Sequence, residues 1–198
     1  FFIVLTLLSK KSKILIKNVN VNESRIGIIK ILKKMNCDIS VKNKRIYKGE
    51  EIADIIAKST KNIKAVNCPS GLNSSAIDEF LVIFLVAAKA KGISTFKNLD
   101  ELNKKESPRL NIAIKILNMI GINTLRKKNY LKIYGNPNLN LNKKFIIKNF
   151  MKDHRVFMMS CVAGLVLGGK WTIHDPESVN TSFPSFFNII KRLGAKLD

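Results

Sequence analysis

Acidic residues, histidine and cysteine are all scarce in this sequence, and their scarcity limits the kinds of site it can build. Aspartate and glutamate number 14 against 35 lysines and arginines, so the formal net charge is +21. The three cysteines (Cys37, Cys68 and Cys161) lie far apart without the spacing of metal ligands, and the two histidines do not complete a cluster with them. We therefore expect no metal site, and buried thiols in a reducing, cytoplasmic environment.

A signal peptide and a membrane-spanning run are also missing at the start of the sequence. Phe1–Leu8 is apolar, but it has neither a basic segment before it nor a small-residue cleavage site after it. It is also much shorter than the roughly 20 residues that span a bilayer. We interpret it as the interior of a helix whose beginning is absent, so we expect an N-terminally truncated fragment without a membrane partner.

The residues that are present suffice for a hydrophobic core. With 198 residues, 46% of them hydrophobic, the chain can form one domain or two small ones. A large basic excess can indicate nucleic acid, an anionic membrane or anionic small substrates. The lysines are spread along the chain instead of gathered in one block, so the charge by itself argues little for a nucleic-acid partner.

One pattern occurs three times along the chain: a strand, a loop, a helix start marked by serine, and an amphipathic helix. The strands are expected at Ile14–Val19, Ser94–Leu99 and Trp171–Pro176, and the helices at Ile28–Met35, Ile114–Met119 and Phe187–Gly194. A more hydrophobic helix precedes each strand, at Phe1–Leu8, Glu79–Ala90 and His154–Leu167. Helices that are apolar on nearly all sides belong in a core.

Two hairpin-like stretches complete the pattern. Asp38–Tyr47 and Asn123–Tyr134 alternate apolar residues around a polar turn, which predicts two strands in each. The polar segments Glu50–Ser75 and Gly135–Met151 look like crossings between units. We expect an α/β domain of three units, at approximately residues 1–68, 69–150 and 151–198, the third of them cut short. Such units would bring the starts of their amphipathic helices to a common face and build an anion site there.

Polar groups gather at the predicted helix starts. They are Ile77-Asp78-Glu79, Lys105-Glu106-Ser107-Pro108-Arg109, Asp153-His154-Arg155 and Ser182-Phe183-Pro184. Ser107 is expected to be an N-cap and Pro108 the first helical residue. Asp78 and Asp153 also stand where a cap is expected. For Asp78, capping and catalysis are both open, whereas Asp153 is expected to be a cap.

In order and spacing, these four groups resemble the C-terminal half of the EPSP synthase (3-phosphoshikimate 1-carboxyvinyltransferase) family. That family has Ile-Asp-Glu before an apolar helix, then Glu-Leu-Arg-x-Lys-Glu-Ser-Asp-Arg, Asp-His-Arg and Ser-Phe-Pro. The resemblance covers essentially all 198 residues. It implies an α/β domain of three βαβαββ units that faces a second such domain across the active site, with no metal or organic cofactor. We expect a monomer.

The resemblance also implies a reaction and a role for each matching residue. The family transfers the enolpyruvyl group of phosphoenolpyruvate to shikimate 3-phosphate and releases phosphate, on the route to chorismate and the aromatic amino acids. Asp78 would take the proton of the attacking hydroxyl, and Lys105 would contact shikimate 3-phosphate and the reacting centre. Glu106 would handle the proton on the methylene carbon, with His154 assisting nearby, while Arg109 and Arg155 would bind phosphoenolpyruvate. This chemistry needs a base, an acid and cations for its anionic ligands.

Three positions depart from the family pattern. Asn103 replaces an arginine, Pro108 replaces an aspartate, and Thr181 stands where some members have a lysine. A decayed homologue therefore stays open. So do a sister transferase that acts on a UDP-sugar and a basic nucleic-acid-binding module, although the main interpretation includes no nucleic-acid partner. The remaining phosphate-binding residues would come from a missing N-terminal domain of the same polypeptide, so the isolated chain is expected to be inactive.

Overall fold

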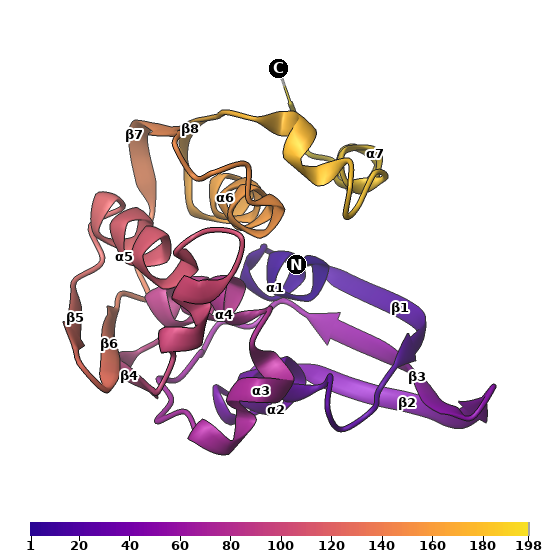
Figure 1. Ribbon diagram of the computed structural model, residues 1–198. Helices are drawn as coiled ribbons and strands as arrows, with labels where there is room; N and C mark the ends of the chain where they lie inside the picture. The colour runs from indigo at the N-terminus through magenta and orange to yellow at the C-terminus, as the bar shows by residue number, and fades with distance from the viewer. Residues whose placement is uncertain (198) are drawn as a thin grey trace.

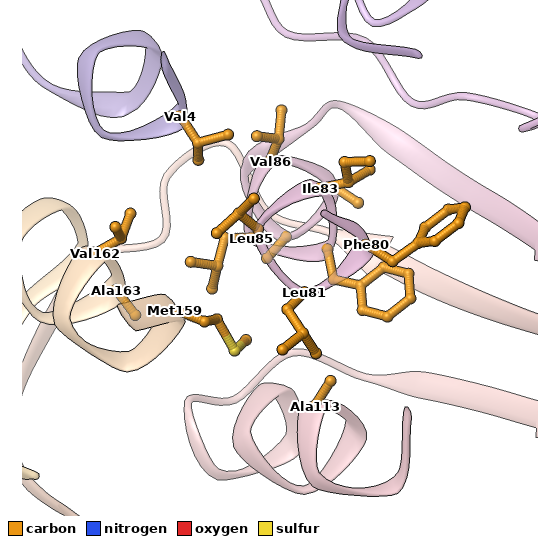
Figure 2. Packing of buried hydrophobic residues seen from close by; sticks show 14 of the residues in the cluster. Val4, Phe80, Leu81, Ile83, Leu85, Val86, Ala113, Met159, Val162 and Ala163 are labelled. Atoms are coloured by element: carbon orange, nitrogen blue, oxygen red, sulfur yellow. The ribbon is translucent and has the colours of Figure 1, made fainter. Parts of the chain in front are cut away.

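Three hydrophobic helices lie at the centre of the computed structural model, which describes residues 1–197 (Figure 1). They are α1 (Phe2–Leu8), α4 (Phe80–Lys89) and α6 (His154–Leu167). Every residue from Phe80 to Ala88 is at most 1% exposed, because α4 has packing partners on all sides. Figure 2 shows Val4 of α1 and Met159 of α6 on the same side of α4, and Ala113 of α5 (Arg109–Met119) facing it from another direction.

Three sheets lie outside this helical centre. In the first, β3 (Glu50–Lys58) pairs antiparallel with β1 (Lys13–Asn20) on one edge and β2 (Ile39–Tyr47) on the other. In the second, β6 (Tyr130–Gly135) lies between β4 (Gly92–Lys97) and β5 (Thr124–Lys127), again antiparallel to both. The third contains β7 (Leu141–Ile147) and β8 (Gly168–Ile173), which are parallel.

Three shorter helices complete the helical part of the described residues. They are α2 (Gly27–Lys34), α3 (Asn73–Ala76) and α7 (Phe186–Arg192), with 3₁₀ turns at Ser70–Leu72, Asp100–Lys104 and Pro176–Val179. No helix within residues 1–197 has the length and apolar character needed to cross a lipid bilayer.

The predicted α/β fold and its helices are confirmed. The three hydrophobic helices and the three strands that follow them all form within a few residues of the predicted limits. Ile28, Leu32 and Met35 are buried on the inner side of the α2 segment, as their helical spacing predicts. All three cysteines are free and buried, and burial raises the pKa of the Cys37 and Cys161 thiols to about 12. These thiols are therefore poor nucleophiles at neutral pH.

The predicted hairpin at Asp38–Tyr47 is wrong. The whole stretch is one strand, β2, and its hairpin partner is β3, which belongs to a segment predicted to be a crossing. Asn43 has a positive φ of 53°, a conformation that is common in tight turns. Here, however, it belongs to a bulge between Lys42 and Arg45. Its side chain donates to Asp54 at 2.8 Å, which holds the bulge against β3. The other predicted crossing, Gly135–Met151, likewise contains β7.

Candidate active site

Arg109 ties together the starts of three helices. It is the first residue of α5, and its side chain is only 1% exposed. Its Nε donates to Asp153 Oδ2 at 2.9 Å, just before α6, and its Nη1 donates to Asp78 Oδ1 at 3.3 Å, shortly before α4. Its Nη2 donates to Glu106 in the turn that precedes α5. The guanidinium is therefore buried with a carboxylate partner on each of its nitrogens.

Asp78 is surrounded by three cationic side chains. Besides Arg109, Lys105 Nζ lies 3.8 Å from its Oδ1, and Arg155 Nη2 lies 3.6 Å from its Oδ2. Arg155 also donates to the backbone oxygen of Asp78 at 2.8 Å, which fixes the chain at this point. The Asp78 side chain is 30% exposed, so a ligand can reach it.

Asp153 is a buried carboxylate that forms the floor of the site. Its Oδ1 accepts from the backbone N–H of Arg155 at 2.9 Å, so it caps α6 as predicted. Its Oδ2 accepts from Ser107 Oγ at 2.9 Å as well as from Arg109. One carboxylate thus joins the end of the loop before α5 to the first turn of α6, and the residues of both segments are held in fixed positions.

The side chains that a ligand can reach are the more exposed ones around this buried carboxylate. Glu106 is the most exposed at 56%, while Lys105 and Arg155 are about a quarter exposed, at 26% and 24%. His154 is partly buried beside them, and burial is the largest cause that lowers its pKa. The structure therefore brings the predicted residues Asp78, Lys105, Glu106, Arg109, His154 and Arg155 to one place.

Two carboxylates to which the sequence analysis assigned no role also belong to this cluster. Glu79 Oε1 lies 3.6 Å from Arg155 Nη1, and Glu101 Oε1 lies 3.9 Å from Lys105 Nζ. The pKa of Glu79 is raised because the carboxyl is buried, an effect that Arg155 partly opposes. The spacing of Glu101 and Lys105, four residues apart, is a signal from which their contact could have been predicted.

The fourth predicted group, Ser182-Phe183-Pro184, has no hydrogen bond or ion pair to this cluster within residues 1–197. Phe183 instead packs edge-on against Phe2 of α1, with ring centroids 5.7 Å apart. The helix N-termini that come together are those of α4, α5 and α6. The sequence predicted that three amphipathic helices would meet here, but two of the three helices, α4 and α6, are hydrophobic core helices. Of the three amphipathic helices, α5 alone contributes an ion pair here among the described residues.

The predicted cap of α5 is wrong. Ser107 does not cap the helix, because its hydroxyl donates to Asp153, and Pro108 occupies the N-cap position instead of the first helical one. The cap comes from Asn103, whose Oδ1 accepts from the backbone N–H of Asn111 at 3.1 Å. Asn103 was one of the departures from the family pattern, and it has a structural role here. Asp78 does not cap α4 either. Ser24, the serine that precedes α2, does not cap that helix.

This cap gives a measurable prediction. We expect Asn103→Ala to lower the free energy of unfolding by about 1 kcal/mol, because one N–H of the first turn of α5 loses its partner. Urea unfolding followed by circular dichroism measures the change. Ser24→Ala is the matched control, since Ser24 makes no cap, and it is expected to change stability by less than about 0.5 kcal/mol. Equal effects of the two substitutions would contradict the cap at Asn103.

A second prediction concerns pH. Burial by itself raises the pKa of Asp153, but the hydrogen bonds from Arg109 and Ser107 and the charge of Arg109 outweigh it, so the pKa lies below its ordinary value. Such a carboxyl contributes stability above its unfolded pKa of about 3.9, and this contribution is lost as the pH falls through the folded pKa. We expect Asp153→Asn to be less stable than the wild type at pH 7, and the gap to shrink below about pH 4. Urea unfolding at stepped pH tests this, and a gap that stays constant would contradict it.

Within residues 1–197, no group of three or more histidine, cysteine, aspartate or glutamate side chains is placed to hold a metal ion. The described cluster offers carboxylates, a lysine, an imidazole and two guanidinium groups. Cations packed around a reachable carboxylate suit the binding of a small, multiply charged anion next to a proton acceptor.

Comparisons with known proteins agree on one family. The family model for EPSP synthase (3-phosphoshikimate 1-carboxyvinyltransferase) matches residues 1–190. The chain is 35% identical to a 3-phosphoshikimate 1-carboxyvinyltransferase of Petrotoga mobilis over 98% of its own length and 44% of the relative's. It is 36% identical to the protein of that name from Zymomonas mobilis, over 100% of its own length and 44% of the relative's. The chain therefore spans less than half the length of the curated relatives it matches.

Solved structures give the same result. An EPSP synthase structure from Acinetobacter baumannii superposes with a TM-score of 0.89 at 34% identity, covering 96% of this chain and 44% of that one. The enolpyruvyl transferase NikO from Streptomyces tendae superposes with a TM-score of 0.70 at 16% identity, covering 98% of this chain and 42% of that one. The second likeness indicates a shared fold only.

Proposed function

Because the chain belongs to the EPSP synthase family, we propose that its parent polypeptide transfers the enolpyruvyl group of phosphoenolpyruvate to shikimate 3-phosphate. The products are 5-enolpyruvylshikimate 3-phosphate and phosphate. The reaction is a step on the route to chorismate and the aromatic amino acids. The observation that carries this proposal is the position of Asp78, a reachable carboxylate in contact with Lys105, Arg109 and Arg155.

The proposed first step forms a bond between the acceptor hydroxyl oxygen and the central carbon of phosphoenolpyruvate. Asp78 accepts the hydroxyl proton, and the methylene carbon receives a proton from Glu106, whose side chain is 56% exposed. In the second step the bond to the phosphate oxygen breaks, and Glu106 takes a proton back from the new methyl group. Lys105 lies beside Asp78 and stabilises the charge that develops at the reacting centre, with His154 assisting.

We assign anion binding to Arg155 and Arg109, which differ in how easily a ligand can reach them. Arg155 is partly exposed and can offer its guanidinium to a carboxylate or phosphate directly. Arg109 is buried and already paired, so a ligand reaches it by taking the place of Glu106, its exposed partner. This exchange frees Glu106 for proton transfer at the moment the anion arrives, which couples binding to catalysis in one movement.

The length of the relatives bears on where the rest of the site lies. Because residues 1–198 correspond to 44% of a relative, we place the remaining phosphate-binding groups in a second, N-terminal domain of the parent polypeptide. The three units at approximately residues 1–68, 69–150 and 151–198 then form the C-terminal domain. We further propose that the parent is a cytoplasmic monomer that uses no metal or organic cofactor, and that residues 1–198 alone do not turn over.

Phosphate release measures this function. The parent polypeptide is expected to release phosphate when it is given phosphoenolpyruvate and shikimate 3-phosphate, and the isolated chain is expected to release none. Replacing shikimate 3-phosphate with a UDP-sugar as acceptor tests the sister activity, for which no release is expected. A parent that is folded but inactive with both acceptors would refute the proposal and favour a decayed homologue.

A further inference from the structure

Two of the cations around Asp78 also have a second carboxylate partner. Arg155 lies 3.6 Å from Asp78 Oδ2 through its Nη2 and 3.6 Å from Glu79 Oε1 through its Nη1. Lys105 Nζ lies 3.8 Å from Asp78 Oδ1 and 3.9 Å from Glu101 Oε1. Because the proposed reaction engages Asp78 with the acceptor hydroxyl, a cation held by the Asp78 carboxylate alone would lose its partner at that moment. A second carboxylate keeps the cation in place.

The Nη1 group of Arg155 faces two oxygen atoms. It donates to the backbone oxygen of Asp78 at 2.8 Å, and Glu79 Oε1 lies 3.6 Å from the same nitrogen. A guanidinium carries five N–H groups in a fixed planar fork, and two of them belong to Nη1. Within residues 1–197, the Nε of Arg155 donates no hydrogen bond, and its Nη2 has only the ion pair with Asp78 at 3.6 Å. The Nε–Nη2 edge is therefore the part that can bind a carboxylate or phosphate through two parallel hydrogen bonds.

Glu79 is fixed at the start of the central helix α4. It occupies the N-cap position, and its backbone N–H donates to Ala76 O at 2.9 Å. Its carbonyl oxygen accepts from the N–H groups of Val82 and Ile83, both at 3.1 Å. Burial raises the pKa of the Glu79 carboxyl, and among the charges that oppose this effect the largest is that of Arg155. The carboxylate and the guanidinium therefore stabilise one another on a rigid support.

We infer that Glu79 is a positioning residue of the proposed reaction, which holds Nη1 of Arg155 so that the Nε–Nη2 edge is presented to phosphoenolpyruvate. The inference rests on the proposed function. Glu79 itself neither touches the ligand nor moves a proton. Without its carboxylate, the guanidinium turns towards the carboxylate of Asp78, its remaining ion-pair partner, and the edge that binds the ligand is no longer aligned.

The charge of Glu79 acts in the opposite direction to this role. A carboxylate beside an anion-binding arginine repels the anion, so by Coulomb's law alone its removal strengthens the binding of phosphoenolpyruvate. Loss of the positioning contact weakens that binding, because a binding group that is misplaced by about 1 Å can lose as much as about 100-fold in effect. The sign of the change in affinity therefore separates the two effects.

Substitutions in the parent polypeptide test the inference. We expect Glu79→Ala to raise both KM and Kd for phosphoenolpyruvate about 10-fold while kcat changes less than about 3-fold, since the contact acts equally before and during the reaction. Glu79→Gln removes the charge but keeps an oxygen for Nη1, so its Kd is expected to stay within about 3-fold of the wild type. Glu51→Ala is the matched control, because Glu51 pairs with Lys44 in the first sheet, and its values should equal those of the wild type. A Kd for Glu79→Ala that is unchanged or lower would overturn the inference.

A double-mutant cycle shows whether Glu79 acts through Arg155. In an Arg155→Ala background, Glu79→Ala is expected to change the Kd for phosphoenolpyruvate less than about 2-fold, because the group that it positions is gone. A further loss of about 10-fold in that background would overturn the inference, since Glu79 would then act on the ligand by another route. Wild-type parent that neither binds phosphoenolpyruvate nor releases phosphate would overturn the proposed function and this inference together. Wild-type turnover with equal Kd values for wild type and Glu79→Ala would overturn the inference alone.

Discussion

Replacing Arg109 with alanine is expected to lower the free energy of unfolding of this chain by about 3–5 kcal/mol. The guanidinium is the partner of Asp153, a carboxylate that is 1% exposed, and it also separates the negative charges of Asp78 and Glu106. Without it, a buried charge loses its counter-ion and its hydrogen bond at 2.9 Å, and two further carboxylates repel one another. Urea unfolding of the chain 1–198 at pH 7 measures the loss.

Arg126→Ala is the matched control for this experiment. Arg126 pairs with Asp100 at 3.4 Å at the surface, where both side chains are more than a third exposed, so its removal is expected to cost less than about 1 kcal/mol. Similar losses for the two arginines would contradict a structural role for Arg109. If the loss is as large as expected, Arg109→Ala cannot be used to test phosphoenolpyruvate binding in isolation. The expectation from the sequence that Arg109 mainly binds this ligand then describes only one of its roles.

The helical part of the fold was predictable because its signals are local. A helix that is apolar on all sides, such as Phe80–Lys89, has no stable place outside a core, so composition alone indicates its position. The first sheet was harder to predict, because Asn43 and its neighbours look like a turn in sequence. What makes them a bulge is the contact with Asp54, 11 residues away on another strand. No local pattern contains that contact.

The candidate site was likewise predictable in part from the sequence. Its residue types and their helix-start positions were visible in the sequence, and the structure brings Asp78, Glu106 and Arg109 together as a group. The hydrogen-bond partners were not visible. Ser107 had two possible uses, capping its own helix or holding Asp153, and only the packing of α5 against α6 decides for the second. Once Ser107 is used in this way, the cap of α5 must come from elsewhere, and it comes from Asn103.

Asp78→Asn in the parent polypeptide is expected to lower kcat by a factor on the order of 10²–10⁴, the range that a general base contributes. Asparagine keeps the size of the side chain and an oxygen for Arg109, and Arg155 still bonds to the backbone oxygen of residue 78 at 2.8 Å. The site should therefore keep its shape. Removing one negative charge between three cations should leave the Kd for phosphoenolpyruvate unchanged or slightly lower.

A large loss of kcat with little change in Kd would distinguish the two hypotheses for Asp78, a structural carboxylate and a general base. A purely structural carboxylate would change stability and binding together, whereas a base changes the rate of the chemical step and shifts its pH profile. Rapid-quench kinetics and calorimetric titration with phosphoenolpyruvate measure the two effects on the same protein. Asp100→Asn is the control, since Asp100 is 62% exposed and pairs with Arg126 away from the cluster, so its kcat should match the wild type. If Asp78→Asn keeps more than about a tenth of the wild-type kcat, Asp78 is not the base, because loss of a general base lowers the rate by at least about 10²-fold.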